Sequence, residues 1–257
     1  MIKFFRKIRQ GLLSKGNTGK YLKYALGEIV LVVFGILIAL SINNWNSDRL
    51  QSKKNKQLLR KMSKELDQHG ERLSRLLDPT GTTAYKATFA YRATYTDSLY
   101  KILDKGIEPE DFDYFIGGER YYSITLNFNT TVFEELLNTG NLYAVGSDSL
   151  VEKIQQYYQR YKRQKFYNTE IGTKVADLQK ACSLGYIDFE YWYQKNPENA
   201  IAENSWIYEP KSENYVSFRI YMGYFRTHSR IMVEGLTVIN EMRTELKTAI
   251  NNEIESL

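Results

Sequence analysis

The sequence predicts an all-α protein, with one N-terminal transmembrane helix that continues into a stalk and an antiparallel helical bundle after it. An apolar segment lies near the N-terminus, and only four prolines occur in 257 residues. Beyond this segment, apolar residues recur at the three- and four-residue spacing of amphipathic helices. We divide the chain into a basic amphipathic flank (1–20), a transmembrane helix (21–45), a stalk helix (46–77) and a helical extramembrane domain (78–257).

The transmembrane prediction rests on residues 25–42, ALGEIVLVVFGILIALSI, which carry a single charge. Extended to 21–45, the segment is about 37 Å of helix, enough to span a hydrocarbon core of about 30 Å. A cleaved signal peptide is the alternative, but INNWN follows in place of a small-residue cleavage site, which favours an uncleaved anchor. Aromatic residues at both ends form the predicted membrane interface: Tyr21, Tyr24 and Trp45.

Three further features of the N-terminal region are ambiguous. Gly35 and Ala39 form a small-xxx-small pair, a candidate helix–helix contact in a homo-oligomer. Glu28 is either an intramembrane functional group or a carboxylate tolerated at headgroup level near a helix N-terminus. Residues 2–13 are either an interfacial amphipathic helix or a basic flank that only sets orientation.

The distribution of charge predicts orientation and partners. Residues 1–27 carry seven Lys or Arg and no acid, a tail that is costly to translocate, so we expect a cytoplasmic N-terminus. Residues 46–65 also carry seven, and basic flanks on both sides of the apolar segment suit a bilayer with anionic headgroups. Residues 157–167, YYQRYKRQKFY, interleave basic and aromatic side chains, but their aromatics align with a heptad seam, and the extramembrane domain is acidic overall. We therefore expect no nucleic-acid partner.

Two blocks of sequence carry a family resemblance. MIKFFRKIR and YALGEIVLVVFGILIALSINNWN resemble the N-terminus of a family of single-pass inner-membrane proteins of Bacteroidota, a domain of unknown function. More loosely, TVFEELLNTGNLYAVGSDSLVEKIQQYY resembles that family's extramembrane region. The resemblance implies an inner-membrane anchor and a periplasmic domain, and it implies no activity.

Local signals divide the extramembrane domain into elements. The stalk ends at the turn Asp78-Pro79-Thr80-Gly81, and a second helix over 83–104 ends at Gly106. Residues 121–128 are an extended or helical connector, 191–210 a loop, and two helical runs follow from Asn214. Two capping boxes, Thr131 with Glu134 and Ser149 with Glu152, open helices, and Gly140 closes the first.

A heptad seam marks the helix that starts near Ser149, and its middle is polar, with Gln164 and Asn168. These two residues are either hydrogen-bonded inside the bundle or the floor of a binding pocket. The seam consists of Leu150, Ile154, Tyr157, Tyr161, Gln164, Asn168, Ile171, Val175, Leu178 and Cys182.

Motifs for catalysis, cofactors and metals are absent from the sequence. It has no phosphate-binding loop, dinucleotide fingerprint, Glu-x-x-His or Gly-x-Ser-x-Gly. A single cysteine, Cys182, excludes Cys-based zinc sites, and two histidines, His69 and His228, are too few for most metal sites. We therefore expect no enzyme. The leading hypothesis is a non-catalytic envelope protein that binds a protein partner; the others are a ligand-sensing bundle and, more weakly, an unrecognised hydrolase.

Overall fold

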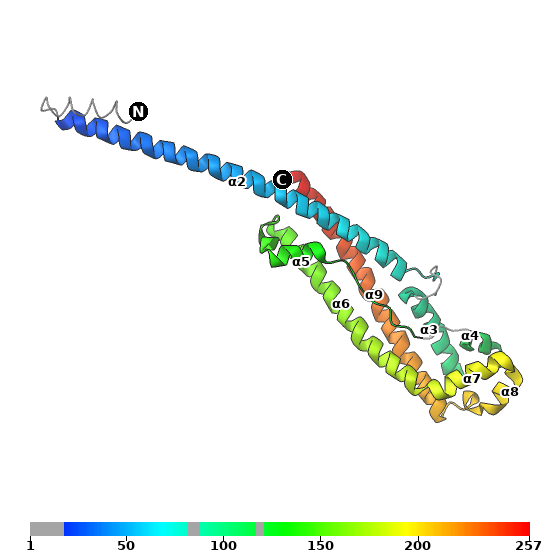
Figure 1. The fold of residues 1–257 in the computed structure, drawn as a ribbon. Helices are drawn as coiled ribbons and strands as arrows, with labels where there is room; N and C mark the ends of the chain where they lie inside the picture. Colours follow the sequence, from blue (N-terminus) through cyan, green and yellow to red (C-terminus); the bar gives the residue numbers. More distant parts are fainter. Residues whose placement is uncertain (1–17, 82–87, 117–120) are drawn as a thin grey trace. The chain divides into compact units, whose positions relative to one another are not determined.

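The structure is a computed structural model of the chain, and it describes residues 18–81, 88–116 and 121–257 (Figure 1). These residues form helices and no strand, which confirms the all-α prediction. The α-helices are α2 (Thr18–Leu76), α3 (Phe89–Lys105), α4 (Phe112–Ile116), α5 (Thr131–Asn138), α6 (Asp148–Ala181), α7 (Ser183–Lys195), α8 (Pro197–Glu203) and α9 (Glu213–Ser256). Three 3₁₀ turns are η1 (Pro109–Asp111), η2 (Asn141–Ala144) and η3 (Ser205–Tyr208).

The chain forms two compact units, residues 1–57 with Leu257, and residues 58–256. The boundary falls inside the predicted stalk, because α2 contributes to both units. In the first unit the apolar side chains of α2 are exposed to solvent. Among the residues that the structure describes, α2 alone is long and apolar enough to cross a membrane. Membrane anchors and signal sequences share this property.

The second unit is a helical bundle built on the antiparallel pair α6 and α9. Ser147, which precedes α6, donates its hydroxyl to Glu253 at the end of α9 (2.8 Å). In one half of the bundle, residues 58–76 of α2 pack on this pair, with Leu59, Met62 and Leu66 fully buried. In the other half, α3, α4, α7 and α8 surround the start of α9 and the end of α6.

The helical stripes predicted for α6 and α9 are confirmed by burial. In α6 the seam is buried from Leu150 to Val175, apart from the half-buried Ile171. The two helical runs predicted from Asn214 are one continuous helix, α9, of 44 residues. Since no proline interrupts the helix, its buried face continues from Tyr215 to Ile250, with His228 and Ser229 as polar residues within it.

The prediction of a loop over 191–210 is wrong, because α7, α8 and η3 occupy most of it. Pro197 is the first residue of α8, where its missing N–H costs no helical hydrogen bond. Asn196 caps this helix by accepting from the amide of Asn199 (3.2 Å). Burial of Trp206 and Ile207 against the bundle then orders a segment whose composition is that of a loop.

Both predicted capping boxes are wrong in register. Thr130 rather than Thr131 precedes α5, and its hydroxyl donates to Glu134 (2.6 Å). Ser147 rather than Ser149 precedes α6. The closing glycine is confirmed: Gly140 has a φ of 69°, in the left-handed region that glycine favours. The start of the helix predicted over 83–104 lies outside the described residues, and α3 begins at Phe89.

Candidate functional site

Residues 121–130, termed the connector below, cross the bundle as an extended chain without a neighbouring strand. Side chains of α6 take the place of that strand. Asn168 donates its amide to the carbonyl of Ile124 (2.8 Å). Tyr161 donates its hydroxyl to the carbonyl of Leu126 (3.1 Å) and accepts from the amide of Phe128 (2.9 Å). The prediction of a non-strand connector is therefore confirmed, with its backbone bonded to helix side chains.

Arg92 of α3 holds the connector from another side. Its side chain is fully buried, and its guanidinium donates to the carbonyl of Tyr122 (2.7 Å). The guanidinium carbon also lies 5.6 Å from the ring centroids of Tyr121 and Phe225. These cation–π contacts stabilise a charge that has left water.

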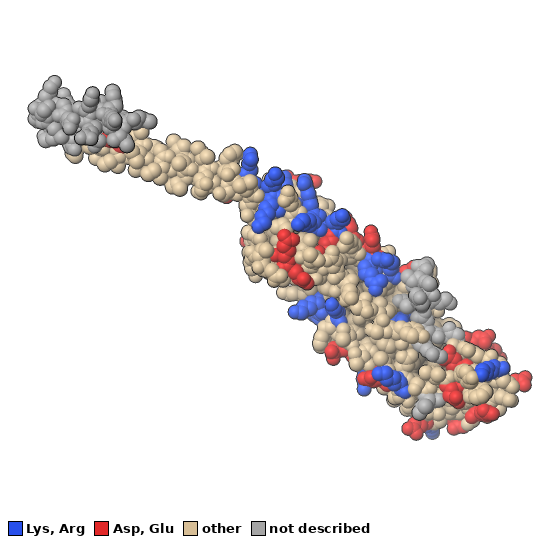
Figure 2. Space-filling model, in the orientation of Figure 1, with Lys and Arg blue, Asp and Glu red and all other residues tan. Residues whose placement is uncertain are grey.

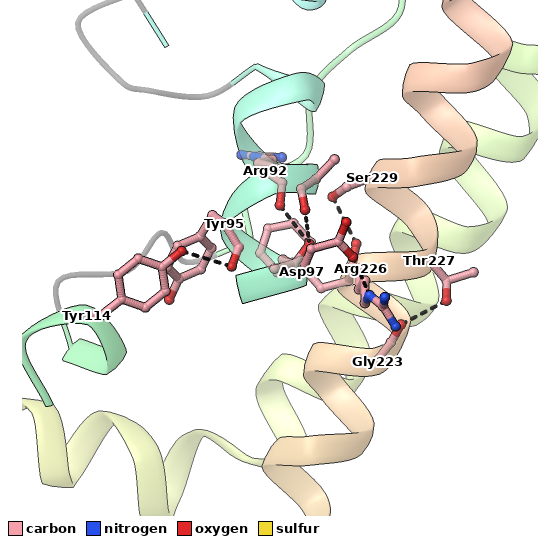
Figure 3. A network of polar contacts seen from close by, with 11 residues as sticks. Arg92, Tyr95, Asp97, Tyr114, Gly223, Arg226, Thr227 and Ser229 are labelled. Carbon is pink, nitrogen blue, oxygen red and sulfur yellow. Dashed lines mark hydrogen bonds and ion pairs between the residues drawn. The ribbon is translucent and has the colours of Figure 1, made fainter. Parts of the chain in front are cut away.

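Arg226 joins α9 to α3 in the network of Figure 3. It forms an ion pair with Asp97, and its guanidinium carbon lies 5.0 Å from the ring centroid of Tyr100. Nearby, the Tyr114 hydroxyl donates to the carbonyl of Tyr95 (3.2 Å). The ion pair holds α3 on α9 and the Tyr114 hydrogen bond holds α4 on α3, so we assign this network a structural role.

His69 of α2 bonds the end of the connector. Its Nε2 lies 2.6 Å from the carbonyl oxygen of Asn129, which can only accept, so Nε2 carries the proton. Nδ1 then accepts from the hydroxyl of Tyr157 (2.8 Å). The ring stacks on Phe128 with 4.7 Å between centroids. Burial lowers the pKa of His69 to about 4, so the ring is neutral at pH 7.

Glu65 lies one helical turn before His69 and is 2 % exposed. One carboxylate oxygen accepts from the hydroxyl of Tyr158 (2.5 Å), and the other accepts from the amide of Val132 (2.9 Å). The second bond satisfies an amide in the first turn of α5, where helices lack internal acceptors. Burial raises the pKa of Glu65, and these hydrogen bonds oppose that rise.

The polar middle of the α6 seam is hydrogen-bonded inside the bundle, which confirms that interpretation. Gln164 donates to the carbonyl of Ile231 (3.2 Å) and lies across Gly235, where a Cβ would overlap its amide. Asn168 accepts from Nε2 of His228 (3.2 Å). Burial first, and the charge of Arg92 second, lower the pKa of His228 to about 4.

Asn168 also lines a groove between the connector and α6, so the pocket interpretation has a structural counterpart. The groove encloses about 400 Å³. One wall is the connector from Tyr121 to Leu126, and the other is the face of α6 from Lys165 to Lys180. Between these two lysines, the small residues Gly172 and Ala176 line the α6 side of the groove and leave its space open.

A second surface feature is the α7 aromatic patch, which comprises Ile187, Tyr191 and Trp192. Tyr191 is 50 % exposed and Trp192 is 45 % exposed. The ammonium of Lys195 lies 4.1 Å from the ring centroid of Tyr191. Residues 183–213 carry six acidic and two basic side chains, and acidic groups gather over α7 and α8 in Figure 2. The patch is therefore aromatic in acidic surroundings.

The residues predicted to contact the membrane or a second helix all belong to α2. Trp45 is exposed, and Arg49 lies 5.7 Å from its ring centroid. The backbone of Tyr21 and Tyr24 is helical, but their side chains lie outside the described part of the chain. Gly35 and Ala39 are exposed, and a Cβ at Gly35 would meet no atom within 4 Å. Among the described residues, no other side chain packs against Gly35.

Within residues 18–81, 88–116 and 121–257, no cluster of three His, Cys, Asp or Glu side chains is placed to hold a metal ion. Cys182 is buried, and burial raises the pKa of its thiol to about 11, so it is a poor nucleophile at pH 7. The buried histidines are both engaged by groups of the bundle and the connector.

A helical bundle preceded by a long apolar helix is the class of protein that these observations define. The chain belongs to a family of unknown function, DUF6090, whose model matches residues 28–185. The match runs from the apolar segment of α2 through the connector to the start of α7. No curated protein and no solved structure shows significant similarity to the chain.

Proposed function

We propose that the protein is a non-catalytic, membrane-anchored envelope protein whose bundle binds a protein partner as an accessory subunit. The α7 aromatic patch is the observation that carries this proposal. Exposed Tyr and Trp side chains are typical anchors of protein interfaces, since they bury large areas with few rotatable bonds. The net charge of −4 over residues 183–213 favours a partner with a basic surface.

The anchor in this proposal is α2, in the inner membrane of a bacterium of the Bacteroidota, with a periplasmic bundle. The basic N-terminal flank supports a cytoplasmic N-terminus. Beyond the apolar stretch, α2 carries Arg49, Lys53, Lys54 and Lys56, and Figure 2 shows basic side chains gathered there. Such a cluster next to a transmembrane helix attracts anionic headgroups, by about 1 kcal/mol per charge.

We predict that an Asn252→Cys variant is labelled by an impermeant maleimide in spheroplasts. Asn252 is exposed near the end of α9, whereas the native Cys182 is buried and protonated, so it contributes little background. A cysteine introduced in the N-terminal flank at Ser14→Cys should react only after lysis. Labelling of the second variant in intact spheroplasts, without labelling of the first, would reverse the proposed topology.

Co-purification from native membranes in mild detergent tests the partner. We expect a stoichiometric complex with a different protein, weakened by added salt and reduced at least about tenfold by the double substitution Tyr191→Ser/Trp192→Ser. The control is Phe166→Ser, which removes a similarly exposed aromatic side chain from α6. A particle that contains only this chain, or a complex that both variants retain, would contradict the proposal.

A ligand-sensing periplasmic bundle that signals through a partner is the second candidate. The groove beside Asn168 favours it, because a ligand there would contact both the connector and α6. A ligand that prefers one arrangement of these elements shifts the bundle toward that arrangement. Ligand-dependent stabilisation without any protein partner would support this function over the first.

A further inference from the structure

The groove between the connector and α6 has an excess of hydrogen-bond donors. Carbonyl groups of the connector are used by the bundle: those of Tyr122, Ile124, Thr125 and Leu126 accept from Arg92, Asn168, Arg72 and Tyr161. By contrast, the amides of residues 122–127 have no acceptor among the described residues. Extended backbone normally uses donors and acceptors equally, whereas over residues 122–127 of the described chain only the carbonyls of Ser123 and Asn127 are unbonded beside six unbonded amides. This segment therefore has more unbonded N–H groups than unbonded carbonyls.

The Tyr121 hydroxyl adds a side-chain donor to this wall. The residue is 5 % exposed, lines the groove, and its hydroxyl makes no hydrogen bond within the described part of the chain. Its oxygen lies directly over Gly172, so closely that a Cβ there would overlap it. The buried ring holds this hydroxyl at the groove, where it can donate to a bound acceptor.

Positive charge marks the opposite wall. Lys165 is exposed at one end of the groove, and no acidic group of the described residues lies within ion-pair distance of it. Lys180, at the other end, is 3.7 Å from Asp177. The groove therefore combines one unpaired ammonium group, Lys165, and a second, Lys180, that is paired with Asp177, with the Tyr121 hydroxyl and a backbone segment rich in unbonded amides.

We propose that this groove binds an oxyanion, either a phosphate or a carboxylate, of a small ligand. Oxyanions offer only acceptors, so they complement a site of amides, hydroxyl and ammonium. The Tyr121 hydroxyl and Lys165 are the groups that distinguish this site from an ordinary hydrated surface. This inference rests on the second proposed function, the ligand-sensing bundle, and names the class of ligand that the bundle would sense. It does not depend on the α7 aromatic patch.

The test uses the full-length protein in non-ionic detergent and measures its thermal unfolding. Inorganic phosphate and succinate are the two probes, each compared with sodium chloride at equal ionic strength. We expect at least one oxyanion at 10 mM, about ten times a millimolar Kd, to raise the Tm by a few degrees. The responding probe identifies a phosphate or a carboxylate as the natural group.

Two substitutions are expected to abolish this shift: Tyr121→Phe, which removes only the hydroxyl, and Lys165→Gln. The matched control is Lys174→Gln, on an exposed position of α6 that does not line the groove. A wild-type protein that responds to neither probe, or a response that both groove variants retain, overturns the inference. Co-purification of a partner is measured separately, so failure of this site and failure of the docking proposal are distinguishable.

Discussion

The substitution Glu65→Ala is expected to lower the free energy of unfolding of the bundle by about 3 kcal/mol or more. It leaves the hydroxyl of Tyr158 and the amide of Val132 buried without an acceptor. Each unmet donor costs about 1–3 kcal/mol, and the lost side chain leaves a small cavity. For a domain whose total stability is about 5–15 kcal/mol, this change is large. Urea unfolding of the full-length chain in detergent, followed by far-UV circular dichroism, measures it.

Two further variants separate the hydrogen bonds from other effects. Glu71→Ala removes a carboxylate from an exposed position of the same helix and should change the stability by less than about 0.5 kcal/mol. Glu65→Gln keeps one acceptor oxygen, so an intermediate loss is expected. Equal stabilities of Glu65→Ala and Glu71→Ala would show that the buried carboxylate does not hold α5 to the bundle.

The sequence indicates in part that Glu65 and His69 lie in the core of the bundle. Glu65 and His69 lie on the same helical stripe as Met62, Leu66 and Leu73, all of which are buried. A charged residue and a histidine on a buried stripe indicate polar groups with partners inside the core. The seam of α6 and the stripe of α9 were predictable for the same reason, because 3.6-residue periodicity is local information.

The partners of these side chains were not predictable. The bonded groups are far apart in the sequence: Asn129 lies 60 residues from His69, and Val132 lies 67 residues from Glu65. The backbone of the connector carries no residue-specific signal for Tyr161, Asn168 or Arg92. Its alternation of buried and exposed residues is that of a strand, although helices provide its hydrogen bonds. The loop predicted over 191–210 failed similarly, since burial of Trp206 is a tertiary effect that outweighs local propensity.

Acidification from pH 7 to pH 4.5 is expected to lower the stability of the bundle by several kcal/mol through His69 and His228. In the folded protein both pKa values are lowered to about 4, from about 6.5 in the unfolded chain. Above pH 6.5 neither state binds these protons, so the full stability is present. Between pH 6.5 and 4 the unfolded chain binds protons that the folded bundle excludes. The loss is about 1.4 kcal/mol per pH unit for each histidine and is complete below pH 4.

Neutral substitutions identify the residues responsible. His69→Gln and His228→Asn should each remove about half of the loss between pH 7 and pH 4.5, whatever their effect on stability at pH 7. Glu65 acts in the opposite direction, because its pKa is raised and the folded state gains its proton as the pH falls. Its contribution is common to the wild type and both variants, so it cancels in the comparison. A double variant that carries both substitutions should lose little stability between pH 7 and pH 4.5. If it loses as much as the wild type over this range, the two histidines are not the groups that resist protonation. If the loss is halved in each single variant, the neutral rings that bond Asn129 and Asn168 make the fold of the bundle sensitive to pH.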